Sequence, residues 1–233
     1  MMRRLLLAYL LSLSISTPVW AEASRSFDGT NDNISMGNVL NVTTGDFTSC
    51  VWAKVTAANN ALADTFIGKK DGFASTQPGY ILFQRAAAGD AGSLRTSDGV
   101  DSCNADGTTD IDSSWFFVCG TWDGAAKTCT FYVNEVQDAT TTNTLVGSLT
   151  NALNLIIGEA AGGTGDMSGT LSYGHQHTKI LTAVELAELR WKPGMVADSL
   201  GGFWPLWGDA TEIDLSGNAR TGTVTGATTS SDG

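Results

Sequence analysis

Short runs of alternating apolar and polar residues cover most of the chain. The clearest is Phe47–Val55, in which Phe47 and Val51 fall on one face of an extended strand and Cys50 and Trp52 on the other. The other predicted strands are residues 34–36, 65–69, 79–85, 92–96, 100–104, 115–122, 128–133, 145–149, 153–157, 169–179, 203–207, 213–215 and 222–224. Many short strands separated by Gly, Asp and Asn turns predict an all-β fold, a two-sheet antiparallel jelly-roll sandwich.

Two local signals punctuate this pattern. Asp123 and Gly124 separate the apolar runs 115–122 and 128–133, which is the strongest hairpin signal in the chain. Thr182 and Glu185 have the spacing of a capping box and precede apolar residues at near-helical spacing, so we expect one short helix over residues 182–191. The tail after residue 226 is rich in Thr, Ser and Gly and is predicted to be mobile.

The first residues have the pattern of a secretory signal peptide. Arg3 and Arg4 precede the mostly apolar residues 5–19, and small residues follow, so cleavage is expected after Ala21 or Ala23. We therefore expect residues 1–23 to be removed and residues 24–233 to form one exported, extracellular domain. The apolar run is too short to span a membrane, and no later stretch approaches that length.

Charge and cysteine content narrow the function. The formal net charge is −11, and an acidic surface repels phosphate backbones and anionic lipids, so nucleic acid and membrane surfaces are not expected partners. The four cysteines of an exported chain predict two disulfides, with three possible pairings. Their spacing is not that of a zinc site.

Five segments, taken in order, resemble a known family. They read FDGTNDNISMG, FTSCVWAKV, WFFVCGTWDGAAKTCTFYVNEV, LNLIIGE and SGTLSYGHQHTKILTAVELAEL. Together they resemble the laminin-G-like domains of the concanavalin A-like lectin/glucanase superfamily, over most of residues 27–189. Members typically have an Asp-Gly turn, like Asp123-Gly124 here, before a strand like residues 132–134, and a short helix like residues 181–189.

A second resemblance, to pentraxins of the same sandwich fold, bears on the cysteines. In pentraxins a disulfide joins two strands that match the positions of Cys50 and Cys119. The resemblance therefore implies a Cys50–Cys119 bridge and leaves Cys103 to pair with Cys129.

The chain departs from the family pattern in two places. Ser172 and Tyr173 stand where the family strand usually has acidic residues, which weakens a calcium site borrowed from that strand. Residues 204–224 are similar to the segment that usually opens such domains, but here they come last. They either complete this sandwich from its other end or begin a truncated second copy.

Candidate catalytic and transition-metal residues are few. Glu212 and Asp214 match the first half of the alternating acidic strand used by glycosidases of this superfamily, but the second acid is absent, so a strand end entering a turn is favoured. His175 and His177 share a strand face about 7 Å apart and could bind a metal together. No third ligand is evident, and a structural role is favoured.

Calcium is the more plausible ion. Asp28, Asn31, Asp32 and Asp166 offer oxygen ligands in turns, which is the chemistry that Ca2+ requires. The alternative is that Asp and Asn are present only because they favour turns.

Sugar rings stack on aromatic side chains, and Trp52, Tyr80 and Trp122 are the predicted ligand-binding aromatics, although most aromatics of a sandwich fill its core. Loops 59–64, 71–77 and 162–166 form the expected binding edge. We predict an exported, non-catalytic module that binds glycans or extracellular proteins with calcium. The alternatives are a structural or adhesive component of a cell surface or virion coat, which would self-associate as a homo-oligomer, and a glycoside hydrolase.

Overall fold

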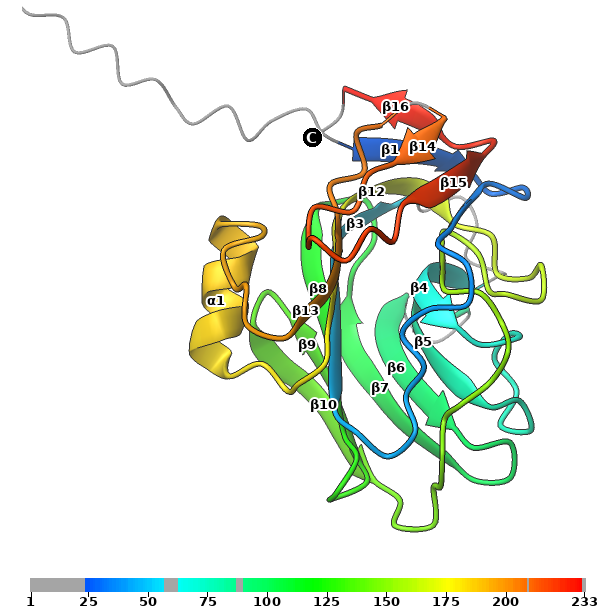
Figure 1. Ribbon diagram of the computed structural model, residues 1–233, viewed down its shortest axis with the longest axis vertical. Coiled ribbons are helices and arrows are strands. Elements are labelled where there is room, and N and C mark those ends of the chain that lie inside the picture. The colour runs from blue at the N-terminus through cyan, green and yellow to red at the C-terminus, as the bar shows by residue number, and fades with distance from the viewer. Residues whose placement is uncertain (1–23, 57–62, 87–89, 209, 232–233) are drawn as a thin grey trace, which may run out of the picture.

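The computed structural model describes residues 24–56, 63–86, 90–208 and 210–231. Residues 1–23, with the expected signal peptide and its cleavage sites, lie outside these ranges, as do residues 59–62 of one predicted loop. The described residues form two antiparallel sheets and a single helix, which confirms the predicted sandwich (Figure 1).

Sheet A has the strand order β10-β9-β8-β3-β12-β1-β16, and β13 also pairs with β12. Its strands are β1 (Ser24–Asp28), β3 (Phe47–Val55), β8 (Phe116–Asp123), β9 (Thr128–Val133), β10 (Val136–Thr142), β12 (Ser168–His177), β13 (Leu200–Trp204) and β16 (Thr228–Ser230). The first half of β12 pairs with β1 and the second half with β13. Tyr173, at the bulge between the halves, has a positive φ of 51°.

Sheet B has the order β14-β15-β2-β11-β4-β5-β6-β7. Its strands are β2 (Asn33–Ser35), β4 (Asp64–Lys69), β5 (Gly79–Gln84), β6 (Ala91–Ser97), β7 (Ser102–Asp110), β11 (Ile156–Ile157), β14 (Thr211–Glu212) and β15 (Gly222–Thr225). Strands β4 to β7 run in sequence order because short turns connect neighbouring antiparallel strands.

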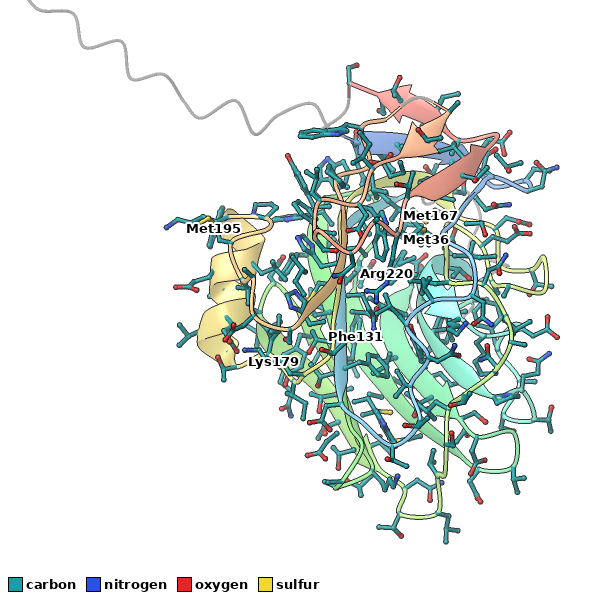
Figure 2. All side chains as sticks on the ribbon, in the orientation of Figure 1. Met36, Phe131, Met167, Lys179, Met195 and Arg220 are labelled. Carbon is teal, nitrogen blue, oxygen red and sulfur yellow. A yellow bond between two sulfur atoms is a disulfide. The ribbon has the colours of Figure 1, made fainter. Side chains whose placement is uncertain are left out.

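The main core lies between the two sheets. Phe47 and Val51 of sheet A and Leu82 and Leu94 of sheet B belong to one cluster of buried side chains. Figure 2 shows Met36, Met167 and Phe131 of the same cluster pointing into the space between the sheets. The alternation of β3 is therefore real, and its Phe47 face is the one that points inward.

Helix α1 (Ala183–Trp191) covers the outer face of sheet A (Figure 1). Its capping box is confirmed, since Thr182 Oγ1 accepts from the Glu185 amide and Glu185 accepts from the Thr182 amide. Leu186 and Leu189 pack on Phe117 in a second, smaller cluster. The outer face of sheet A thus has an apolar core of its own under the helix.

The hairpin of β8 and β9 is confirmed. Asp123 Oδ1 accepts from the amides of Ala125 and Ala126, which fixes the turn. A side chain at Gly124 would meet the Thr44 carbonyl oxygen at 2.0 Å, so only glycine allows the loop before β3 to lie against this turn.

Several elements differ from the prediction: β1 was not predicted, and β7, β11, β13 and β14 have other bounds than expected. Residues 136–142 form strand β10, which was missed because most of this edge strand is exposed and lacks apolar alternation. Residues 145–149 are not a strand; Val146 and Leu149 are buried from an irregular loop. Residues 228–230 of the tail, predicted to be mobile, form β16, because they pair with β1.

The C-terminal segment completes the sandwich. Strand β15 pairs with β2 and strand β16 with β1, so residues 222–230 add to both sheets beside the first strands (Figure 1). Arg25 Nε lies 3.0 Å from Glu212 Oε2, and both side chains are buried. This buried ion pair joins β1 to β14, and so links the first and last parts of the described chain.

Candidate functional site

The predicted Cys50–Cys119 disulfide is confirmed. The two cysteines face each other on the paired strands β3 and β8, with Cα atoms 4.2 Å apart. Both lie on the outer face of sheet A, in the cluster beneath α1. The bridge therefore fastens neighbouring strands and lies away from solvent, which gives it a structural role.

The predicted bridge between Cys103 and Cys129 is not present, because both residues are buried free thiols. They lie on β7 and β9, where the two sheets approach each other. Each thiol donates to a carbonyl oxygen, Cys129 Sγ to Cys103 at 3.3 Å and Cys103 Sγ to Thr141 at 3.1 Å. Hydrogen bonds to the backbone occupy the sulfurs in place of the covalent bond.

Two of the three predicted sugar-binding aromatics are wrong. Tyr80 is 1% exposed and Trp122 is 0% exposed, and both belong to the core between the sheets. The Tyr80 hydroxyl donates to the Leu40 carbonyl oxygen at 3.0 Å. Alternation showed that these rings share strand faces with other residues, but not that those faces point inward.

Trp52 is half-buried on the outer face of sheet A, where Arg190 of helix α1, far away in the sequence, lies against its ring. The Arg190 guanidinium lies 5.7 Å from the Trp52 ring and 4.7 Å from the Trp191 ring, and Trp191 is exposed. Arg190 also pairs with Glu135 at 2.6 Å. The sequence pattern identified Arg190 and Trp191 only as the end of a helix, so it did not predict that they would lie beside Trp52.

Glu212 and Asp214 are structural carboxylates. Glu212 accepts from the amides of Leu206, Trp207 and Gly208 as well as from Arg25. Burial alone would raise the pKa of Asp214, but hydrogen bonds from Ser216, Phe203 and Arg220 lower it. Both carboxylates are fully engaged by donors inside the protein, as the turn interpretation predicted.

The two histidines are buried in the protein. His175 stacks on Phe203 at a centroid distance of 4.4 Å, and its Nε2 accepts from the Gly194 amide. Burial, and then the neighbouring His177, lowers the pKa of His175 to about 3, while burial lowers that of His177 to about 4. Both are therefore neutral structural residues at physiological pH.

The four predicted calcium ligands lie together, where the loop after β1 meets the loop before β12. The Asn31 amide donates to Asp166 Oδ1 at 3.2 Å, and the Asp28 amide donates to Asp32 Oδ2 at 2.9 Å. The Gly29 amide donates to the Met167 carbonyl oxygen, which holds the two loops side by side. The fold thus joins residues that are far apart in the sequence.

Further carboxylates extend this cluster along the same end of the sandwich. Mutual repulsion links them in a chain, from the loop after β1, through Asp166 and Asp64, to the ends of β7 and the loop before β6. We call this set the acidic rim: Asp28, Asp32, Asp64, Asp90, Asp110, Asp112, Glu159 and Asp166. Asp64 ends the loop 59–64 that was predicted as part of the binding edge, although it was not predicted as a metal ligand, and Glu159, two residues after β11, was missed.

Three carboxyl groups of the acidic rim have raised pKa values. Burial, followed by repulsion from other carboxylates of the acidic rim, raises the pKa of Asp64 to about 7 although the Ser168 amide donates to it. Burial, with repulsion from Asp28 and Asp166, raises the pKa of Asp32. Burial, with repulsion from Asp166, raises that of Glu159. A bound cation would stabilise the ionised forms.

The donor chemistry of the acidic rim suits a hard cation, while its geometry is incomplete. Within the described ranges, no three His, Cys, Asp or Glu side chains are arranged to hold a metal ion. Asp28, Asp32 and Asp166 each turn one oxygen to a backbone amide. Calcium also accepts carbonyl, water and ligand oxygens, so the carboxylates present fit part of its coordination.

The predicted binding loops that fall within the described residues contact each other over sheet B. A side chain at Gly162 would meet Asp71 at 1.7 Å, and one at Gly165 would meet Phe73 at 2.4 Å. Phe73 packs on Phe83 of β5 with centroids 4.7 Å apart. Loops 71–77 and 162–166 therefore cover the outer face of sheet B next to the acidic rim.

The sequence of residues 28–187 matches the model of the laminin-G-like family described as the concanavalin A-like lectin/glucanases superfamily. No curated protein sequence is significantly similar to the chain. No helix within the described ranges is long and apolar enough to cross a membrane.

Solved structures of other proteins share the fold. A candidate carbohydrate binding protein from Bacteroides ovatus superposes with a TM-score of 0.69 at 18% identity, covering 89% of this chain, which spans 59% of that protein's length. The heptameric SAP-like pentraxin of Limulus polyphemus gives 0.60 at 15% identity, over 89% of this chain and 97% of the pentraxin. The CBM40 of Ruminococcus gnavus IT-sialidase, bound to α2,3-sialyllactose, gives 0.52 at 13% identity, over 72% and 98%.

Proposed function

This chain belongs to the concanavalin A-like lectin/glucanases superfamily, and we propose that it is an exported, non-catalytic module that binds glycans with a calcium ion at the acidic rim. The names of its structural neighbours support this function, since one is a candidate carbohydrate binding protein and another is bound to sialyllactose. Export is supported by the disulfide and by the N-terminal sequence pattern.

The observation that carries the proposal is the repulsion within the acidic rim. Repulsion from Asp166 contributes to the raised pKa of Asp32, Asp64 and Glu159, so carboxylates from three different segments repel one another around Asp166. A divalent cation beside Asp166 would attract each of these carboxylates and so offset their mutual repulsion. When bound, calcium supplies open coordination positions that the paired hydroxyls of a sugar can fill.

The non-catalytic part of the proposal is supported by the acidic residues that a glycosidase would need. Glu212 and Asp214 are buried, and donors inside the protein occupy them. A glycosidase keeps one carboxyl ready to protonate the leaving oxygen and a second ready to attack or to activate water. Neither Glu212 nor Asp214 is placed to reach a substrate.

A glycan array on residues 24–233, with 2 mM Ca2+ or with chelator, tests the proposal. We expect binding in calcium that is lost in chelator, and a rise in Tm of several degrees on adding calcium, because a ligand at 100 times its Kd adds about 2.7 kcal/mol of stability. Asp166→Asn should abolish both effects, whereas Asp198→Asn, at an exposed position after α1, should leave them unchanged. No binding to any glycan would overturn the proposed function.

A further inference from the structure

Cationic side chains gather on the outer face of sheet B, on the flank of the acidic rim. Lys70 follows β4, Arg85 follows β5 and Arg95 lies in β6. Burial, and then the charge of Arg95, lowers the pKa of Lys70 to about 8. Burial also lowers the pKa of Arg95, and the charge of Arg85 lowers it further. In a chain of net charge −11, these cations are close enough to repel one another.

Arg95 is a fixed cation held by neutral groups. Its Nε donates to Asn104 Oδ1 at 2.9 Å, its Nη1 donates to the Phe73 carbonyl oxygen, and its guanidinium lies 5.4 Å from the Phe83 ring. No ion pair in the described part of the chain includes Arg95. The guanidinium is therefore oriented, but its charge is not neutralised by a bonded carboxylate.

Arg85 stands beside it with a distant carboxylate. Its Nη2 donates to the Gly107 carbonyl oxygen at 2.9 Å, and its Nη1 lies 3.7 Å from Asp106 Oδ2. Asp106 also accepts from Ser93 Oγ at 2.7 Å and acts electrostatically on Arg95. Asp71 likewise acts on Lys70, so carboxylates and cations lie next to each other on this face.

An aromatic pair lies next to the arginines. Phe73 and Phe83 have ring centroids 4.7 Å apart, and Phe73 is half-buried in the loop that covers this face. The C–H face of a pyranose packs on such a ring, while guanidinium groups recognise carboxylates through two parallel hydrogen bonds. An aromatic ring beside two arginines therefore matches a sugar that carries a carboxylate.

We infer that the outer face of sheet B binds the carboxylate of an acidic glycan through Arg85 and Arg95, with the sugar ring against Phe73. This inference rests on the proposed function and names its substrate class, a glycan with uronic or sialic acid residues. The acidic rim attracts a cation and the arginines attract an anion, so one edge of the molecule offers both charges to a ligand.

Paired glycans test the inference. The chain of residues 24–233 is titrated calorimetrically with trigalacturonic acid and its methyl ester, and with sialyllactose and lactose, in calcium. We expect one acidic member to bind at least tenfold more tightly than its neutral partner, and this advantage to weaken between 50 and 500 mM salt. Arg85→Gln and Arg95→Gln should remove the advantage, and Arg95→Lys should keep part of it.

Lys192→Gln is the matched control, because it removes one exposed cation beyond α1. Circular dichroism and Tm confirm that each variant is folded, and Arg85→Gln keeps the test valid if Arg95→Gln unfolds. Equal binding of acidic and neutral partners, or acidic binding that Asp166→Asn abolishes while Arg85→Gln and Arg95→Gln do not, would overturn the inference and leave glycan binding intact. No binding to any of these sugars, with a silent array, would overturn the proposed function itself.

Discussion

Carboxylates occur in two contrasting environments in this molecule. Glu212 and Asp214 lie in the C-terminal segment, between β13 and β15, which we call the C-terminal closure. Both are buried and receive hydrogen bonds from backbone amides, and Glu212 also pairs with Arg25. Asp32, Asp64 and Glu159 of the acidic rim are also largely buried, but their neighbours include other carboxylates, and their pKa values are raised. Burial is shared by both sets, so the difference lies in the partners.

This difference separates structural from functional acids. A buried carboxylate with several donors stabilises the fold in its ionised form, and the pKa of Asp214 is accordingly lowered. A buried carboxylate among like charges costs stability when ionised, and the protein tolerates it where a ligand can repay that cost. This contrast is the reason for proposing the ligand site at the acidic rim and not at Glu212 and Asp214.

Removing Glu212 should have the largest effect. Glu212→Ala removes the carboxylate that pairs with the buried Arg25 guanidinium and the acceptor of the amides of residues 206–208, so we expect a loss of about 3–5 kcal/mol in the free energy of unfolding. Urea denaturation measures it. The double variant Arg25→Met, Glu212→Met should recover much of the loss, and Glu188→Ala, exposed on α1, should change stability by no more than about 0.5 kcal/mol. A loss equal to that of Glu188→Ala would show that the closure is not held by this pair.

Asp214→Asn should cause the next largest loss in the free energy of unfolding. The amide keeps one acceptor oxygen but places an NH2 group against a backbone donor, Phe203, Ser216 or Arg220, and we expect a cost of about 1–3 kcal/mol at pH 7. Because the pKa of Asp214 is lowered on folding, its contribution is present above the unfolded value of 3.8 and is lost as the pH falls below it. The difference between the variant and the parent should therefore shrink in acid, as thermal unfolding at pH 3 and pH 7 would show.

Asp64→Asn should act in the opposite direction. The folded pKa is about 7 and the unfolded value 3.8, so the unfolded chain loses this proton first and stability falls as the pH rises from about 4 to 7. The asparagine keeps an acceptor for the Ser168 amide and removes the charge, so we expect about 1–2 kcal/mol of added stability at pH 8 in chelator and no gain at pH 4. Destabilisation at both pH values would contradict the assigned repulsion.

Asp28→Asn should have the smallest effect on the metal-free protein. Asp28 is exposed, and asparagine can still accept from the Thr30 amide, so we expect a change within about 0.5 kcal/mol in chelator. In 2 mM Ca2+ the variant should show a smaller rise in Tm than the parent. An equal rise in both proteins would place the cation away from the loop after β1.

Strands, turns and helix caps were predicted correctly where their sequence signals involve only neighbouring residues. The bounds of β3 and β9, the hairpin at Asp123 and the capping box at Thr182 were predicted correctly, because alternation, turn residues and capping are properties of adjacent residues. Strand β10 was missed because an exposed edge strand needs no apolar alternation, and β16 because its order comes from pairing with β1.

The sequence by itself determined the fold class, most of the strands, the family and, through the resemblance to pentraxins, the Cys50–Cys119 bridge. Only the tertiary structure decided which strand faces point inward, and so placed Tyr80 and Trp122 in the core rather than at a sugar. It also decided which charges meet, since Arg25 and Glu212 are 187 residues apart and the acidic rim is drawn from several loops. A period-two pattern identifies faces without identifying the core, and charge partners depend on distances in space that the order of residues does not contain.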